Sequence, residues 1–174
     1  ERSFRSPIQI LQDWVHDILT DEELQAEVFL LARYLMLVDK TEDGSGMLIL
    51  QAERCKQSCL GSELVIEVSD FPNDNKQMSE NEVVSRTRCA ANQPGIHLIT
   101  EPGNALDGFY EWLNRSSTPL SGKSRTLSTT VAVGSESVKT AVSADCKPVI
   151  CMREKEFSSR PLPLLNRLEK VQIG

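Results

Sequence analysis

The stretch KPVICMREKEFSSRPLPLLNRLEK, residues 147–170, contains the two patterns that decide the fold class. It opens with an apolar run at residues 148–152, which has the length of a buried β-strand. A charged segment at residues 153–156 follows this run directly and predicts a turn. The stretch therefore predicts a buried strand that reaches the protein surface just after Met152.

The second half of the stretch predicts a short helix that begins near Pro163. Proline suits the first turn of a helix because the amide proton that it lacks would have no partner there. Three leucines would form one apolar stripe on this helix: Leu164, Leu165 and Leu168. Arg167 would point away from that stripe. A strand and a short helix that directs an arginine outward allow one ATPase subunit to reach the nucleotide of its neighbour.

Further apolar runs, separated by segments with helical patterns, lie upstream at residues 34–38, 64–68 and 96–101. Short buried strands that alternate with helices predict a parallel α/β sheet with helices on both faces. Residues 129–142 interrupt this alternation with two β-rich segments that flank Gly134. This pattern predicts a β-hairpin inserted into the α/β core.

Two of the intervening helices carry specific expectations. The first would begin with Ser79 as its cap, and Cys89 would face the core. The second would be capped by Asn104 and would end near residue 114, with Trp112 on its side. Their aromatic and aliphatic residues are more typical of core packing than of a ligand platform.

Residues 39–46, DKTEDGSG, occupy the place where a nucleotide-binding α/β domain has its phosphate loop. That loop needs glycines that bring backbone amides close to phosphate and a lysine that reaches the outer phosphates. Here three carboxylates lie in or beside the loop and no Gly-Lys-Ser/Thr follows: Asp39, Glu42 and Asp43. The later GKS at 122–124 follows no apolar strand and lacks a glycine-rich cradle, so it predicts a surface loop. We expect residues 39–46 not to hold a triphosphate in the usual way.

Thr100 and Glu101 end the third predicted strand, where an ATPase keeps its acidic pair. In that arrangement an aspartate holds Mg²⁺ and a glutamate orients the attacking water. Threonine is a poor anchor for Mg²⁺, whereas Glu101 is suitably placed for the second role. The alternative is that Glu101 begins a turn with Pro102 and Gly103. His97 is more typical of a strand residue with a satisfied neighbour than of a base or ligand.

Composition excludes several classes of protein. The net charge of -6 and the pI near 5.0 argue against a nucleic-acid-binding surface. No apolar run approaches the length of a membrane span. Five irregularly spaced cysteines favour reduced thiols in the cytosol over a disulfide framework. Cys55 and Cys59 share one helical face and could supply half of a zinc site, but no second pair matches them, so isolated thiols are the favoured interpretation.

Several motifs together resemble the mysterin family of giant RING-type ubiquitin-protein ligases, which are built around AAA+ units. The resemblance covers the chain from about residue 33 to the end. It is carried by SDFPND at 69–74, GFYEWLN at 108–114, SVKTAV at 137–142, MREKEF at 152–157 and PLPLLNRLEK at 161–170. Each motif alone is weak, whereas their combination in this order is specific.

The resemblance implies an AAA+-like core at residues 33–174 that is truncated at its last strand and lacks its lid domain. Residues 1–32 would be a helical linker or the remnant of a preceding unit. It implies ATP and Mg in other units of the parent, zinc in its RING, and no cofactor or metal in this segment. The implied partners are neighbouring AAA+ units and, for the parent, a ubiquitin-conjugating enzyme, in the cytosol and on lipid droplets.

Three functions are consistent with these observations. The first, which we prefer, is a structural or allosteric AAA+ unit that has lost its phosphate loop but keeps Arg167 as an arginine finger for a neighbouring unit. The second is an active ATP hydrolase with an atypical loop and Glu101 as the catalytic carboxylate. The third is an α/β protein-interaction domain in which Arg167 only pairs with Glu169 or Glu156 on a solvated face.

Overall fold

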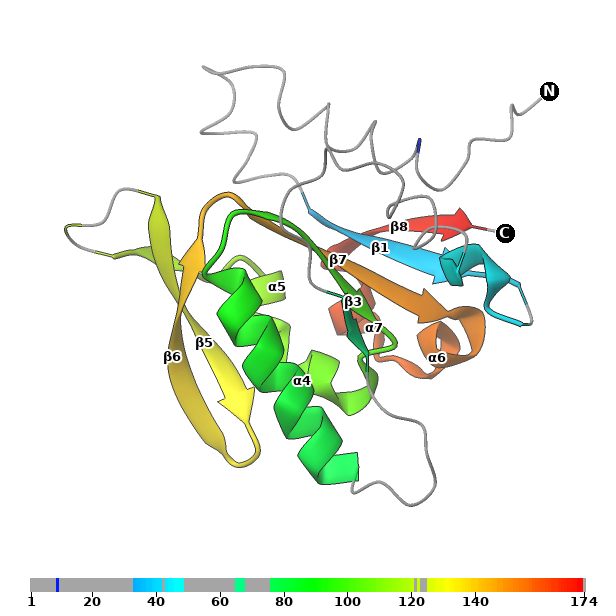
Figure 1. The fold of residues 1–174 in the computed structure, drawn as a ribbon, viewed down its shortest axis with the longest axis horizontal. Coiled ribbons are helices and arrows are strands. Elements are labelled where there is room, and N and C mark those ends of the chain that lie inside the picture. Colours follow the sequence, from blue (N-terminus) through cyan, green and yellow to red (C-terminus); the bar gives the residue numbers. More distant parts are fainter. Residues whose placement is uncertain are drawn as a thin grey trace.

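The computed structural model describes residues 9, 33–41, 43–48, 65–67, 76–120, 122 and 125–173. Its centre is a sheet of five parallel strands in the order β2-β3-β7-β1-β8 (Figure 1). Their bounds are Val65–Glu67 (β2), Gly95–Thr100 (β3), Cys146–Arg153 (β7), Tyr34–Asp39 (β1) and Leu168–Ile173 (β8). The predicted parallel α/β sheet is confirmed, and the predicted strands at 34–38, 96–101 and 148–152 are neighbours in it.

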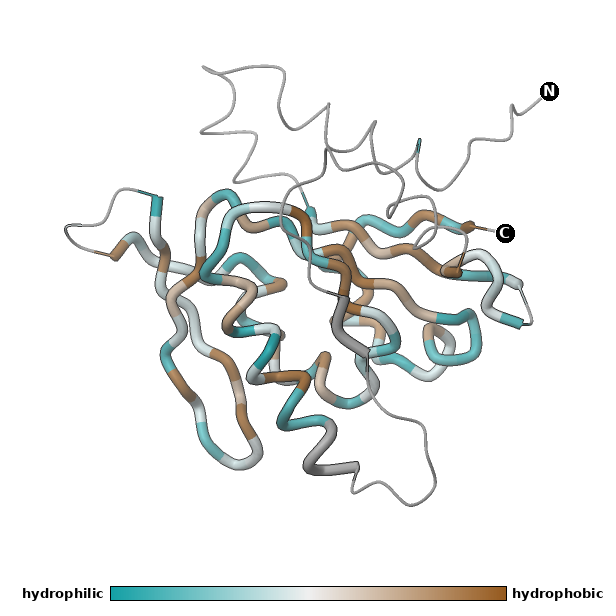
Figure 2. Tube along the Cα trace, in the orientation of Figure 1, coloured by the Kyte–Doolittle hydropathy of each residue, from teal (hydrophilic) through white to brown (hydrophobic). Residues whose placement is uncertain are grey.

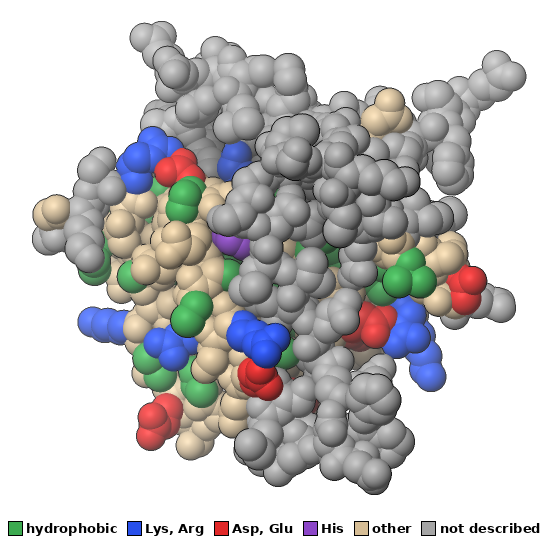
Figure 3. Space-filling model, in the orientation of Figure 1, with side chains coloured by type: hydrophobic (Ala, Val, Ile, Leu, Met, Phe, Trp, Pro, Cys, Tyr) green, Lys and Arg blue, Asp and Glu red, His purple; other side chains and the backbone are tan. Residues whose placement is uncertain are grey.

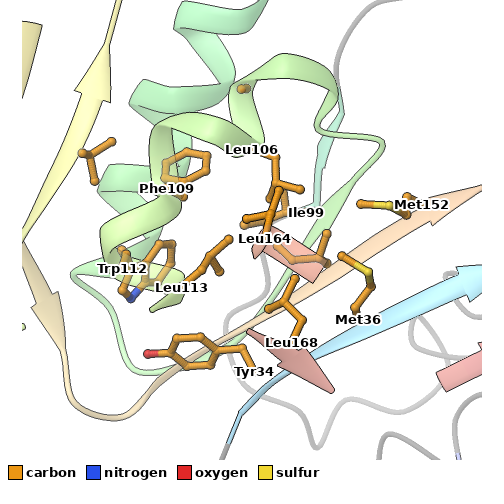
Figure 4. Close-up of a cluster of buried hydrophobic side chains, with 14 of the residues drawn as sticks. Tyr34, Met36, Ile99, Leu106, Phe109, Trp112, Leu113, Met152, Leu164 and Leu168 are labelled. Atoms are coloured by element: carbon orange, nitrogen blue, oxygen red, sulfur yellow. The ribbon is translucent and has the colours of Figure 1, made fainter. Parts of the chain in front are cut away.

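Both faces of the central strands are buried, as expected for a parallel sheet. In β1 the residues Tyr34, Met36 and Val38 belong to one apolar cluster, and the alternating Leu35 and Leu37 belong to a second. The first cluster receives its other members from the helices on that face of the sheet, among them Leu106, Phe109, Trp112, Leu113 and Leu164 (Figure 4). Hydrophobic residues accordingly follow the strands of the sheet in Figure 2.

Helices connect the strands. They are α4 (Lys76–Ala91), the 3₁₀ helix η2 (Gly103–Phe109), α5 (Tyr110–Leu113), α6 (Glu154–Ser159) and α7 (Leu162–Leu165), and a further helical segment is described at residues 45–48. Residues of α4, η2, α5 and α7 contribute to the first apolar cluster. The order of elements along the chain therefore places each loop that follows a strand at the carboxyl edge of the sheet.

The predicted hairpin is confirmed. Strands β5 (Thr126–Val133) and β6 (Glu136–Ser143) pair antiparallel, and Gly134 occupies the turn with a φ of 61°. A short strand β4 (Thr118–Pro119) extends this sheet. The hairpin lies beside α4 (Figure 1), where Arg88 donates a hydrogen bond to Oγ1 of Thr140 at 2.9 Å.

Three predictions about the two middle helices are wrong. Helix α4 begins at Lys76, before the predicted cap Ser79, because Lys, Gln and Met favour the helix. Cys89 is exposed, since the buried side of α4 runs through Val83, Val84, Thr87, Ala90 and Ala91. Asn104 is not a cap: its amide donates to Oε1 of Glu80, and Pro102 occupies the cap position.

Trp112 is buried in the core and does not lie on the side of its helix as predicted. The rings of Tyr34 and Phe109 pack edge-on against its ring, with 6.2 and 6.0 Å between the ring centres. The segment at 153–156 is also different from the prediction. Arg153 is the last residue of β7, and residues 154–156 begin helix α6 instead of forming a turn. Helix α7 ends at Leu165, so Leu168 lies in β8 and not on the predicted helix.

Some predictions lie outside the described residues. They include the helical appendage at 1–32, of which the structure describes only Gln9, and the thiols of Cys55 and Cys59. The division of the chain at residues 32 and 33 and the truncation of the core stay predictions.

Replacing Phe109 by alanine should lower the free energy of unfolding by about 3–5 kcal/mol, because its fully buried ring would leave a cavity. The control is Leu162→Ala on nearby α7, whose side chain is 71% exposed and whose loss should cost no more than about 0.5 kcal/mol. Chemical denaturation of both variants measures the difference. Equal effects would contradict the assignment of Phe109 to the core.

Candidate functional site

A cleft opens at the carboxyl ends of β1 and β7, two neighbouring parallel strands. This β1–β7 cleft has a volume of about 540 Å³ and is lined by Asp39, Lys40, Thr41, Arg153, Glu154, Lys155, Glu156 and Ser159. Open α/β sheets bind their ligands at this edge, in the crevice outside the ends of the strands. The cleft is therefore where a nucleotide would be sought, and it contains the start of the predicted loop at 39–46.

The carboxylate of Asp39 occupies the centre of that loop. Its Oδ1 accepts hydrogen bonds from the backbone amide of Thr41 at 2.8 Å and from Oγ1 of the same residue at 2.6 Å. Its Oδ2 accepts from the backbone amide of Met47 at 2.8 Å. Asp39 is 1% exposed, so these contacts satisfy a buried anion. The backbone donors that a phosphate would use are thus bonded to a side chain of the protein.

Gly46 is necessary for this arrangement. A Cβ atom at this position would lie 2.6 Å from Oδ1 of Asp39, closer than real Cβ atoms approach an oxygen. The amide of Gly46 donates to Oγ1 of Thr41 at 3.2 Å, which links the loop again to the carboxylate. A phosphate loop uses glycine to admit an anion near the backbone. Here glycine admits the carboxylate of Asp39.

A second carboxylate strengthens the negative charge of the loop. The Ser45 hydroxyl and amide hydrogen-bond the Asp43 carboxylate and lower its pKa, so it stays ionised. For an anion about 4 Å from Asp39, repulsion at an effective dielectric constant of about 20 amounts to roughly 4 kcal/mol. That energy corresponds to a loss of affinity of about a thousandfold. The Asp39 carboxylate therefore opposes an anion placed directly at this loop, although Lys40, Arg153 and Lys155 also line the cleft.

Glu101 lies at the same edge of the sheet but is already paired. It follows β3 with a φ of 45°, and both of its carboxylate oxygens accept hydrogen bonds from the guanidinium of Arg153, the last residue of β7. The distance between Nη2 and Oε2 is 2.7 Å. A left-handed backbone conformation in a non-glycine residue is costly and persists only when surrounding contacts hold it. In this conformation the carboxylate of Glu101 is held by the guanidinium of Arg153.

The other acids of the cleft also have partners. Oε1 of Glu156 accepts from the amide of Gly103 at 3.1 Å and from Nη2 of Arg160 at 2.8 Å. Lys40 lies 3.9 Å from Glu154. The side chains of Glu156 and Arg160 are mostly buried. Through its bond to Gly103, Glu156 fixes the start of η2 to α6. Each carboxylate among the residues that line the cleft therefore has a partner.

Arg167 lies at the opposite end of the sheet. It directly precedes Leu168, which pairs with Tyr34 at the start of β1, whereas the cleft begins at Asp39 at its end. Five strand steps of about 3.3 Å place the two ends of β1 about 17 Å apart. Nη2 of Arg167 donates to the hydroxyl of Tyr110 at 2.7 Å, and its Cζ lies 4.4 Å from the centre of the tyrosine ring. The structure thus pairs Glu101 with the cleft residue Arg153 and does not bring Arg167 to the cleft.

Comparison with known families matches residues 23–174 to the RNF213 AAA domain. The chain belongs to this family. RNF213 is mysterin, so the predicted resemblance is confirmed. The sheet described above, with its inserted small antiparallel sheet, is the α/β core of this AAA domain. Asp39 and the pair Glu101–Arg153 lie at the carboxyl edge of this sheet.

An uncharacterised transmembrane protein of Dictyostelium discoideum is 29% identical to the chain over 167 residues. The match covers 95% of the chain and 3% of the Dictyostelium protein, so the chain spans a small part of its relative. No helix among the described residues is long and apolar enough to cross a membrane.

Side chains that could bind a metal ion do not cluster in the described part of the chain. It contains no group of three or more His, Cys, Asp or Glu side chains that could hold an ion. Nε2 of His97 lies 3.3 Å from the backbone oxygen of Gln93, in agreement with the expected satisfied strand residue. On the face drawn in Figure 3, acidic and basic side chains are interspersed. The absence of nucleic-acid binding stays a prediction.

Sequence reasoning missed two functional contacts. The turn predicted at 153–156 gives no sign of the pair between Arg153 and Glu101, because only the register of β3 and β7 brings the two residues together. Tyr110 was assigned only to the core, and its contact with Arg167 spans 57 residues, a distance that no local pattern reports.

Asp39→Asn should lower the free energy of unfolding by about 1–3 kcal/mol, because the new amide group would face a backbone donor inside the buried loop. The matched control in the same cleft is Glu154→Gln. The Glu154 side chain is 56% exposed and its ion pair with Lys40 is loose, so the expected loss is at most about 1 kcal/mol. Denaturant titration compares the two variants. Equal losses would show that the loop does not depend on the Asp39 carboxylate.

Cysteine labelling should separate the described thiols. Burial raises the pKa of Cys146 to about 12, so it remains an unreactive thiol in mildly alkaline buffer, whereas Cys89 is exposed. Alkylation of the folded protein followed by peptide mapping should modify Cys89 and spare Cys146, and denaturant should remove the difference. Rapid modification of Cys146 in the folded protein would contradict its place in the core.

Proposed function

We propose that this segment is a structural or allosteric AAA unit of a mysterin-type protein, and that it does not bind ATP. The observation that carries the proposal is the carboxylate of Asp39, which occupies the backbone donors of the loop at 39–46. A unit whose loop is stabilised by its own side chain does not need a nucleotide in order to adopt this conformation. It can therefore contribute a constant surface to neighbouring AAA units.

The pair Glu101–Arg153 supports the same proposal. A glutamate that orients water must offer a carboxylate oxygen to that water. In this chain both oxygens of Glu101 accept from Arg153. Hydrolysis would require this ion pair to open and Asp39 to leave the loop, and both changes oppose contacts that stabilise the fold. We therefore prefer a supporting role over the alternative of an active hydrolase.

We further propose that Arg167 serves a neighbouring unit as an arginine finger. It lies about one strand length, roughly 17 Å, from the cleft of its own unit. No carboxylate among the described residues forms an ion pair with it, which leaves its positive charge available. The interaction-domain alternative, with Arg167 paired to Glu169 or Glu156, receives no support from these contacts.

The family relationship motivates the remaining proposals for the parent protein. They are ubiquitin-protein transfer together with a ubiquitin-conjugating enzyme, zinc in a RING, ATP and Mg in other AAA units, and a place in the cytosol and on lipid droplets. These properties would belong to parts of the parent beyond this segment.

Calorimetric titration of the segment with Mg-ATP tests the central proposal, and we expect no heat of binding at micromolar nucleotide. A separate AAA unit that contains a complete phosphate loop provides the positive control. Stoichiometric micromolar binding to the segment, abolished by Gly46→Glu, would show that the loop accepts a triphosphate and would overturn the proposal.

A further inference from the structure

Tyr110 provides the second half of the Arg167 site. Its ring lies under the guanidinium, with 4.4 Å between Cζ of Arg167 and the ring centre, and its hydroxyl accepts a hydrogen bond from Nη2 at 2.7 Å. A planar guanidinium that is both stacked on a ring and hydrogen-bonded has a defined orientation. The contact joins residues that are 57 positions apart in the sequence.

Both residues are anchored by rigid elements. Tyr110 begins α5 and directly follows Phe109, which is fully buried, and its backbone oxygen accepts from the amide of Asn114 at 2.9 Å. The amide of Arg167 donates to the backbone oxygen of Leu164 at 3.1 Å, and the next residue, Leu168, is fully buried in β8. The side chain of Arg167 is thus the adjustable part of the contact.

Arg167 has a neutral partner, as Arg88 has in Thr140, whereas four other arginines pair with carboxylates. The guanidinium groups of Arg86, Arg125, Arg153 and Arg160 each pair with a carboxylate. Arg167 instead contacts a neutral phenol, and its Nε is buried without a partner among the described residues. A carboxylate would orient the guanidinium and neutralise it as well. A tyrosine orients it and leaves the full positive charge for an incoming anion.

We propose that Tyr110 is the positioning residue of Arg167, which holds the guanidinium ready for a phosphate group bound to a neighbouring AAA unit. This inference rests on the proposed finger role of Arg167 and adds the residue that sets its geometry. An arginine that stabilises a transition state is effective only when its donors are placed before the reaction. Tyr110 therefore contributes to the rate without contact with the nucleotide.

The test uses the ATPase activity of the full-length parent and a double-mutant cycle. Arg167→Ala should lower kcat in the neighbouring unit by roughly a thousandfold or more. Tyr110→Phe, which keeps the ring and removes the hydroxyl, should lower kcat by roughly three- to tenfold with little change in KM for ATP. The double variant should equal Arg167→Ala, because the hydroxyl acts only through the arginine.

Tyr34→Phe is the matched control. Tyr34 also lies under an arginine, with Cζ of Arg115 4.5 Å from its ring centre, but it does not contact Arg167 in the described structure. This variant should leave kcat unchanged, and thermal unfolding of all variants monitors folding.

The outcomes separate the two proposals. A loss in Arg167→Ala with normal kcat in Tyr110→Phe would overturn the role of Tyr110 and leave the finger role standing. An equal loss from Tyr110→Phe in the presence and absence of Arg167 would show that the Tyr110 hydroxyl acts independently of Arg167 and would also overturn the inference. Unchanged kcat in Arg167→Ala would overturn the finger role and the inference together.

Discussion

The hydrogen bonds between the Asp39 carboxylate and the backbone amides of Thr41 and Met47 determine what the edge of this sheet can bind. Buried amide donors at the end of a strand need an acceptor, and in a nucleotide-binding fold the phosphate supplies it. In this chain the acceptor is part of the protein. The loop is therefore satisfied without a ligand, and an added anion would meet a negative charge instead of free donors.

Around the β1–β7 cleft, other charged groups likewise bond to groups of the protein and not to a ligand. Arg153 pairs with Glu101, and Glu156 bonds both Arg160 and the amide of Gly103. The pair Glu101–Arg153 joins the ends of β3 and β7, and Glu156 joins α6 to the start of η2, so these charges stabilise the fold. Away from the cleft, Arg167 bonds the neutral Tyr110, which leaves its charge uncompensated. The contrast supports a unit that is closed at its own site and can act at its neighbour's.

The sequence was sufficient to predict the strands of the core because their apolar runs report burial on both faces directly. It also predicted the hairpin around Gly134 and the negative charge at the loop. It failed where a residue has two competing local roles. Asn104 has the chemistry of a helix cap, but its amide bonds Glu80 of α4, and Cys89 is apolar enough for the core but lies on the outer side of its helix.

By itself, the sequence determined the alternation of strands and helices, the family, and the lack of a complete phosphate loop, since these depend on residue type and local spacing. Only the tertiary structure decided that the Asp39 carboxylate fills the loop, that Glu101 is paired with Arg153, and that Tyr110 supports Arg167. The last two contacts join residues 52 and 57 positions apart. Such pairs form because parallel strands and their helices bring distant segments to one edge of the sheet, which no local pattern encodes.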